Sequence, residues 1–172
     1  MNNRIDEMVF DSDEDKKLFN LLTHEIIHTQ QPKVYLEDKM KGGEDLREAL
    51  IEAVTECETE YRLNKAGRPF FFDNPDRRPN TGRYKGYKAI LNLAWANDPE
   101  VKRYSWRRGR RMISGSLEEA VDYVSTQLFG KPDAERLHRL VLLIHDRVEE
   151  IIDLPDNNQV IQAWLREQLD SV

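Results

Sequence analysis

Cysteine is nearly absent from this sequence, which holds one copy, Cys57, among 172 residues. A single cysteine cannot form an intramolecular disulfide, and this composition favours a reducing compartment. No apolar run approaches the roughly 18 residues that a membrane-spanning helix needs. The first residues, Met1 to Phe10, also lack the apolar stretch of a signal peptide. We therefore expect a cytoplasmic protein that does not associate with membranes.

Several catalytic signatures are missing as well. The sequence contains no glycine-rich phosphate loop, no nucleophile elbow and no Cys-x-x-Cys pair. Cys57 falls on the apolar face of a predicted helix, where a small core residue is a better interpretation than a nucleophile. No segment alternates apolar and polar residues at the period of two that a half-buried strand requires. These absences favour a helical fold and argue against the common nucleotide-binding and cysteine-dependent enzymes.

Apolar residues recur at helical spacing along most of the chain. With 39% hydrophobic residues, this pattern predicts one all-α domain over residues 1–172, a compact bundle of about six to seven helices without a substantial sheet. An acidic N-terminal segment (1–11) and a loop rich in proline and aromatic residues (66–80) lie outside the predicted helices. The predicted helices cover approximately residues 12–31, 44–65, 81–97, 99–113, 116–129, 132–153 and 157–169.

The first predicted helix is unusually apolar. Leu18, Leu22 and Ile26 recur at i, i+4 and i+8, and Ile27 lies on the far side. A helix that is apolar over most of its circumference is normally surrounded by protein, so we expect this one to be well buried.

Charge is distributed unevenly along the chain, whose formal net charge is −6. Residues 62–111 contain 14 of the 26 Lys and Arg residues and only 4 of the 32 Asp and Glu residues, so this stretch carries a net charge of +10. Aromatic residues are interleaved with these cations, as a polyanion with stacked bases requires. The candidate nucleic-acid-binding residues, all between 77 and 111, are Arg77, Arg78, Arg83, Lys85, Lys88, Lys102, Arg103, Trp106, Arg107, Arg110 and Arg111.

The leading hypothesis is a small non-enzymatic helical protein that binds DNA or RNA through residues 77–111, within a larger assembly and without a cofactor. Arginine forks suit phosphate oxygens, and exposed rings stack on unpaired bases. Two other partners stay open, an acidic protein surface and the acidic flanks of another copy in a homo-oligomer. With either partner the protein is an assembly or adaptor factor.

The sharpest motif is His24-Glu25-Ile26-Ile27-His28, an H-E-x-x-H within the first predicted helix. One helical turn separates His24 from His28, so both imidazoles face the same side and can bind one zinc ion. Glu25 beside them can accept a proton from water at the metal. A third ligand can come from the helix predicted over 44–65, which offers three glutamates at i, i+4 and i+8. These glutamates are Glu52, Glu56 and Glu60. Glutamates at this spacing repel one another unless a cation lies nearby, so the row is a second indication that a cation binds here.

The segment from Ile51 to Glu56 is similar to the segment that follows the first motif in glutamate-ligand zinc peptidases. Over roughly thirty residues the chain therefore resembles the zincin metallopeptidases. The resemblance implies a zinc-dependent hydrolase in which His24, His28 and Glu52 bind zinc and Glu25 is the general base.

A second metal hypothesis uses two E-x-x-H pairs, Glu25 with His28 and Glu135 with His138. Helix-bundle di-iron sites combine two such pairs with two further glutamates, for which the helix over 44–65 and either Glu118 or Glu119 are candidates. A structural role is the alternative for all four histidines. In that role His138 and His145, like His24 and His28, are half-buried, hydrogen-bonded side chains.

The nucleic-acid hypothesis predicts that replacing Arg107, Arg110 and Arg111 together with Ala weakens oligonucleotide binding without unfolding the domain. Each lost phosphate contact reduces the slope of log affinity against log salt by about 0.9 for duplex DNA. Titrations of labelled single- and double-stranded oligonucleotides at several salt concentrations measure this change. Equal affinity of the variant and the unaltered protein would remove the hypothesis.

Overall fold

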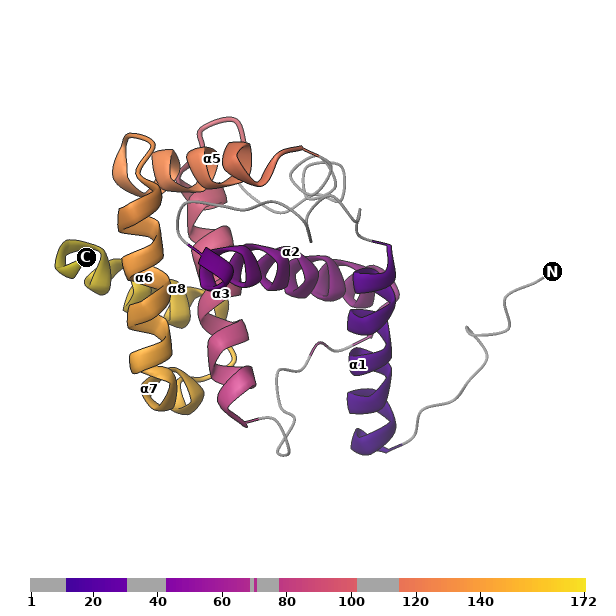
Figure 1. Ribbon diagram of the computed structural model, residues 1–172. Helices are drawn as coiled ribbons and strands as arrows, with labels where there is room; N and C mark the ends of the chain where they lie inside the picture. The colour runs from indigo at the N-terminus through magenta and orange to yellow at the C-terminus, as the bar shows by residue number, and fades with distance from the viewer. Residues whose placement is uncertain (1–11, 31–42, 69, 71–77, 102–114) are drawn as a thin grey trace.

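The computed structural model describes residues 12–30, 43–68, 70, 78–101 and 115–172, with the side chains of 78–80 left out. These residues form seven α-helices and no strand, which confirms the predicted all-α bundle (Figure 1). The α-helices are α1 (Asp13–Thr29), α2 (Gly43–Lys65), α3 (Arg78–Asn97), α5 (Leu117–Phe129), α6 (Ala134–Asp146), α7 (Val148–Asp153) and α8 (Asn158–Gln168), and a short 3-10 turn, η4 (Leu169–Ser171), follows α8. None of the described helices is long and apolar enough to cross a membrane.

Helix α3 is the central element of the bundle. It packs against α2, α5, α6, α7 and α8, so most of the other helices are arranged around it. Helix α1 is the exception, because it packs mainly against α2. Figure 1 shows α1 at one side of the molecule, with α6, α7 and α8 at the opposite side of α3.

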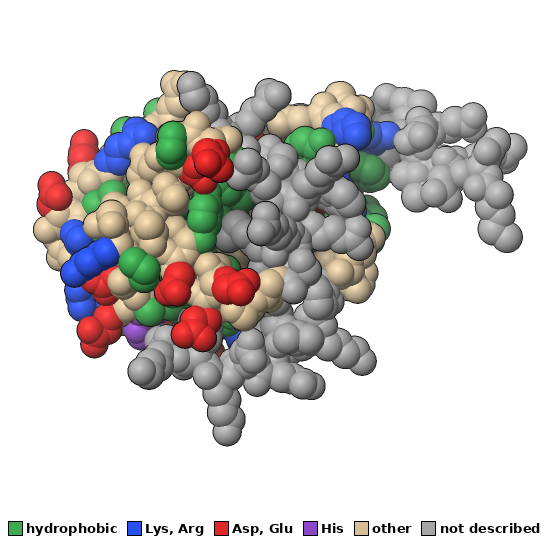
Figure 2. All heavy atoms as spheres, turned by 90° about the horizontal axis from the view of Figure 1, so that it is seen from above, with side chains coloured by type: hydrophobic (Ala, Val, Ile, Leu, Met, Phe, Trp, Pro, Cys, Tyr) green, Lys and Arg blue, Asp and Glu red, His purple; other side chains and the backbone are tan. Residues whose placement is uncertain are grey.

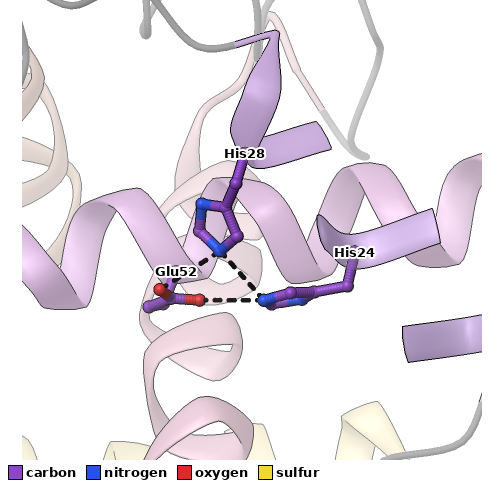
Figure 3. A group of neighbouring side chains, drawn as sticks. All are labelled: His24, His28 and Glu52. Carbon is purple, nitrogen blue, oxygen red and sulfur yellow. Dashed lines mark hydrogen bonds and ion pairs between the residues drawn. The ribbon is translucent and has the colours of Figure 1, made fainter. Parts of the chain in front are cut away.

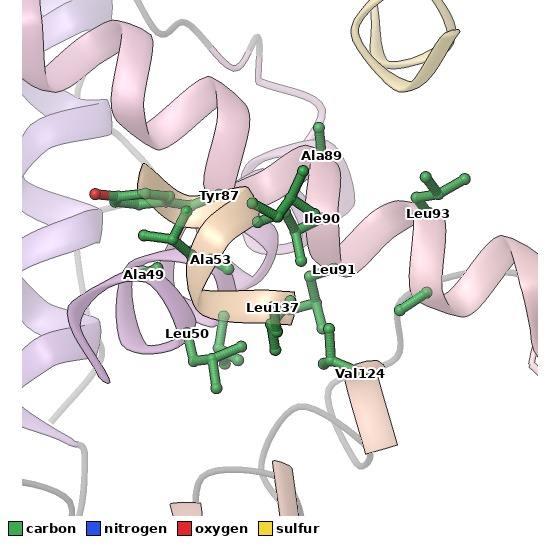
Figure 4. Packing of buried hydrophobic residues seen from close by; sticks show 14 of the residues in the cluster. Ala49, Leu50, Ala53, Tyr87, Ala89, Ile90, Leu91, Leu93, Val124 and Leu137 are labelled. Carbon is green, nitrogen blue, oxygen red and sulfur yellow. The ribbon is translucent and has the colours of Figure 1, made fainter. Parts of the chain in front are cut away.

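The hydrophobic core lies where α2, α3, α5 and α6 meet (Figure 4). Tyr87 and Trp95, both on α3, are the largest fully buried side chains. Both lie in the helix that the sequence predicts over 81–97, and Cys57 on α2 is buried in the same core, as predicted. Burial raises the pKa of the Cys57 thiol, so the thiolate is disfavoured there.

Two glycines let α3 lie close to α6 and α7. A Cβ atom added at Gly86 would be 2.6 Å from Cγ2 of Ile144 on α6, and one added at Gly82 would be 2.6 Å from Cγ2 of Val148 on α7. These distances are shorter than any normal carbon–carbon contact, so glycine is required by the packing and not by the backbone conformation.

Capping side chains fix the ends of several helices where the sequence predicts them. The hydroxyl of Ser12 accepts a hydrogen bond from the backbone N–H of Asp15 at the start of α1, and Ser116 does the same at the start of α5. Asn157 caps α8, and Gly130 in the left-handed conformation ends α5. Each cap satisfies a backbone group that the helix leaves unpaired, which explains why these boundaries are readable from sequence.

Other boundaries differ from the prediction. The helix predicted over 132–153 is interrupted at Arg147, whose backbone leaves the helical region (φ −110°, ψ 25°), and α7 then packs on α3. Helix α3 begins at Arg78, so the loop predicted over 66–80 ends earlier. Most of the helix predicted over 99–113 lies outside the described residues. At its start, the carboxylate of Asp98 accepts a hydrogen bond from the backbone N–H of Glu100.

The expectation that α1 is buried on most sides is wrong. Leu18, Leu22 and Ile26 are 52%, 50% and 50% exposed, whereas the buried residues of this helix are Asn20, His24 and Ile27. The reason is that the polar side chains on the opposite face find partners on α2. Helix α1 therefore presents its leucine stripe to solvent and its histidines to the protein.

Replacing Gly86 with Ala should destabilise the protein by about 1–3 kcal/mol, because the new methyl group would overlap Ile144. An alanine in an open helical position would instead stabilise it. Urea unfolding of Gly86→Ala, Ile144→Ala and the double variant measures the effect, and the cost of Gly86→Ala should fall when Ile144 is truncated. A cost that is unchanged by Ile144→Ala would contradict this packing.

Candidate metal centre

Two pairs of side chains, each pair one helical turn apart, meet where α1 contacts α2. Helix α1 supplies His24 and His28, and α2 supplies Glu52 and Glu56. Residues at i and i+4 lie on the same face of a helix, so each helix presents two functional groups at one level. His24 and Glu56 are buried, and the side chains of Glu52 and His28 are 13% and 26% exposed.

Three donor atoms converge in this cluster (Figure 3). Nε2 of His24 lies 2.9 Å from Nε2 of His28 and 3.3 Å from Oε2 of Glu52. Nε2 of His28 lies 3.3 Å from Oε1 of Glu52. A tetrahedral zinc ion with nitrogen and oxygen ligands at about 2.0–2.2 Å separates those ligand atoms by roughly 3.3 Å. The cluster therefore already has the dimensions of one side of a zinc coordination sphere.

Glu56 holds the His24 ring from the other side. Its Oε1 lies 2.9 Å from Nδ1 of His24, so Nδ1 can donate its proton to this carboxylate. When Nδ1 carries the proton of a neutral imidazole, Nε2 has a free lone pair that points at Glu52 and His28. A carboxylate that fixes the tautomer of a histidine in this way is a common outer partner of metal ligands.

Protons alone do not satisfy the three converging atoms. Nε2 of His24 faces both Nε2 of His28 and Oε2 of Glu52, but an imidazole nitrogen carries at most one proton. Oε2 of Glu52 is inaccessible to water; it makes an ion-pair contact with Nε2 of His24 at 3.3 Å but no hydrogen bond of good geometry among the described residues. A buried carboxylate oxygen without a well-aligned donor costs free energy, and a cation bound between the three atoms would remove that cost.

The charges of the cluster shift the pKa values of its members. Burial by itself would lower the pKa of His24, but Glu52 and Glu56 raise it from 6.5 to about 9. Burial would raise the pKa of Glu52, but the rings of His24 and His28 lower it from 4.5 to about 2. In the metal-free protein at neutral pH, His24 is therefore an imidazolium ion held between two carboxylates.

Two further residues border the cluster. The ring of Tyr84 on α3 stacks on the imidazole of His24, with centroids 5.8 Å apart and an interplanar angle of 17°. Glu25, the candidate general base, is exposed on α1. It is not one of the three converging donors, so its predicted role remains a prediction.

Glu60, the third glutamate of the predicted row, is not part of this cluster. Its Oε2 lies 2.8 Å from Nζ of Lys88, which is also bonded to Oδ1 of Asn158 at 3.1 Å. Lys88 is 1% exposed, so it is a buried side chain that links α3 to α2 and α8. Lys85 is likewise buried, and its Nζ binds Asp156 at 2.5 Å and the backbone carbonyl of Leu154 at 3.1 Å.

Lys85 and Lys88 therefore do not lie on the surface where the nucleic-acid hypothesis expects them, because acids from distant parts of the sequence neutralise both. Arg83 is half-buried. The other candidates have side chains or positions outside the described residues, so their role stays a prediction; they are Arg77, Arg78, Lys102, Arg103, Trp106, Arg107, Arg110 and Arg111. Figure 2 shows acidic and basic side chains interspersed over the described part of one face.

The paired E-x-x-H hypothesis is not supported by the positions of its residues. Glu135 is exposed, and Nε2 of His138 lies 3.8 Å from Oδ2 of Asp45. Within the described ranges, His24, His28 and Glu52 form the one group of three potential metal ligands. The structural role suggested for His145 fits, since its Nε2 is hydrogen-bonded to the hydroxyl of Tyr87.

Sequence reasoning named His24, His28 and Glu52 as one set, and the structure brings these residues together. It offered Glu56 only as another possible ligand and missed its contact with Nδ1 of His24. A signal for it was present, because Glu52 and Glu56 have the same four-residue spacing as the two histidines. Nothing in the sequence indicated that Tyr84 would cover His24.

Comparisons of this chain with protein-family models, with curated proteins and with solved structures found no match.

The metal-free protein should lose stability as the pH rises from 6.5 towards 9, the range between the unfolded and folded pKa values of His24. Below this range His24 is protonated in both states and its contribution is complete. Above it the folded chain also loses the proton, and about 3 kcal/mol of stabilisation is lost. Urea unfolding across this range, in the presence of a chelator, measures the slope.

His24→Gln should abolish most of that slope, whereas the control His138→Gln should keep it. An unaltered slope in His24→Gln would show that the ion pair with Glu52 and Glu56 does not contribute to stability.

Proposed function

We propose that His24, His28 and Glu52 bind a zinc ion and that the protein is a zinc-dependent hydrolase. The observation that carries the proposal is the convergence of two imidazole nitrogens and a carboxylate within 3.3 Å of one another at a largely buried point. One oxygen of that carboxylate has no hydrogen-bond partner among the described residues. Such a set of donor atoms is arranged to bind a cation.

The donor set favours zinc over other common ions. Two imidazoles and one carboxylate suit zinc, whereas magnesium and calcium prefer oxygen ligands alone. Three protein ligands leave one position of a tetrahedral ion for water or substrate, which is typical of catalytic zinc and not of structural zinc. When bound, zinc supplies Lewis acidity and makes water acidic enough to act as a nucleophile near neutral pH.

Glu25 is suited to the general-base role that the resemblance to zincins implies. Successive residues of an α-helix are about 100° apart around its axis, so Glu25 lies roughly 60° from His28. It is exposed, and water and substrate can therefore reach it. In this role its carboxylate accepts a proton from the attacking water and returns it to the leaving group.

A purely structural role is the competing interpretation. His24, protonated and held between Glu52 and Glu56, would tie α1 to α2 without any metal. The two interpretations differ in what happens on adding zinc. Zinc must displace the His24 proton, so binding should weaken as the pH falls and should release protons.

The zinc site predicts one equivalent of tightly bound zinc per chain. Glu52→Gln keeps the shape of the side chain but removes the charged ligand, and should abolish stoichiometric binding. Glu56→Gln should weaken binding by about 10- to 100-fold, because only the outer partner of His24 changes. Elemental analysis after dialysis against zinc, with circular dichroism to verify folding, measures both effects.

His138→Gln is the matched control, since it alters a partly buried histidine outside the cluster and should retain full zinc binding. A second comparison tests hydrolysis. Glu25→Gln should bind zinc normally but lose cleavage of a mixed peptide substrate by mass spectrometry, by about 100-fold or more. Zinc binding that is absent from the unaltered protein, or equal in Glu52→Gln, would refute the proposal.

A further inference from the structure

Arg83 on α3 is a half-buried cation. Its Nε is inaccessible to water and has no hydrogen-bond partner among the described residues. No ion pair joins it to a carboxylate of that part of the chain either. A guanidinium has five N–H donors, and leaving one buried without an acceptor is unfavourable. Lys85 and Lys88 on the same helix have such partners, so the unpaired state of Arg83 needs an explanation.

The groups around Arg83 come from three helices. Its charge acts on Glu48 of α2, on Tyr87 of its own helix and on His145 of α6. The Tyr87 hydroxyl and His145 Nε2 bond to each other. Asp45 of α2 and His138 of α6 lie in the same region, 3.8 Å apart. The described surroundings of Arg83 therefore contain both acidic and basic side chains, yet neither Glu48 nor Asp45 forms an ion pair with it.

Arg83 also lies near the zinc-binding cluster. It precedes Tyr84, whose ring stacks on His24, and it interacts with Glu48, one turn from Glu52. These two connections place Arg83 beside the elements that carry the cluster.

We propose that Arg83 binds a carboxylate of the substrate while the bond to be broken lies at His24, His28 and Glu52. This inference rests on the proposed hydrolase function. It assigns the substrate to a chemical class, molecules that carry a free carboxylate. Arg83 is then a specificity-determining residue whose guanidinium would hold that carboxylate.

A carboxylate fits this position better than a phosphate. The guanidinium fork binds two carboxylate oxygens in one plane. A phosphate group carries a charge of about −1.5 to −2 at neutral pH, and Glu48 and Asp45 would repel it more strongly than a single negative charge. The neighbouring acids therefore select for a singly charged anion.

The side-chain Nε–Hε resonance of Arg83, assigned by its loss in Arg83→Gln, reports ligand binding directly in nitrogen–proton NMR spectra. Three blocked apolar tripeptides serve as probes: one with a free C-terminal carboxylate, its C-terminal amide, and an amide carrying one glutamate side chain. The titrations use metal-free protein first, so that a peptide carboxylate cannot be held by zinc instead. They are then repeated with zinc present.

At least one carboxylate peptide should shift the Arg83 resonance saturably, with the neutral amide at least about tenfold weaker. The tighter of the two carboxylate peptides identifies a chain terminus or an acidic side chain as the source. In Arg83→Gln, the backbone resonances of Tyr84 and Tyr87 should no longer distinguish carboxylate from amide, and Arg83→Lys should restore part of the difference.

Equal affinity for acid and amide, or a stronger response to inorganic phosphate than to any carboxylate, would overturn the role of Arg83. Failure of the hydrolase proposal has a different signature. In that case the protein binds no stoichiometric zinc, but the metal-free titration still shows the preference for carboxylate.

Discussion

One histidine shared between two carboxylates holds α1 against α2. His24 contacts Glu52 through Nε2 and Glu56 through Nδ1, and this contact adds to the packing of the buried Ile27. It decides which face of α1 is buried, and it leaves Leu18, Leu22 and Ile26 in solvent. Because both ring nitrogens are used, the orientation of the imidazole is fixed. Every property suggested for the site follows from that orientation.

Helix α2 can be buried and acidic because separate cations neutralise its carboxylates. His24 pairs with Glu52 and Glu56. Arg62 binds Glu58 at 2.6 Å, and Lys88 of α3 binds Glu60. Removing one partner of such a pair is costly, since an unpaired charge then remains buried. Glu52 differs from the other pairs, because its Oε2 contacts Nε2 of His24 at 3.3 Å without forming a hydrogen bond among the described residues.

The fold and the ligand set could be predicted because they depend on local signals. Apolar spacing and caps such as Ser116 and Asn157 determine helices over a few residues, and H-E-x-x-H places two imidazoles on one face. The buried side of α1 could not be predicted, because hydrophobic spacing does not reveal that distant glutamates will attract polar residues. Burial of Lys85 was missed for the same reason, since its partner Asp156 lies far along the chain. The break in the helix at Arg147 could not be predicted, because no glycine or proline lies at that position or beside it.

The position of α1 at one side of the molecule affects how its stability is distributed. The helices around α3 share a continuous core, whereas α1 is joined to them mainly through α2. We expect such a helix to open locally while the helices around α3 stay folded. A ligand bound jointly by α1 and α2 would therefore raise the free energy of this local opening first, so amide hydrogens of α1 would report occupancy before the core does.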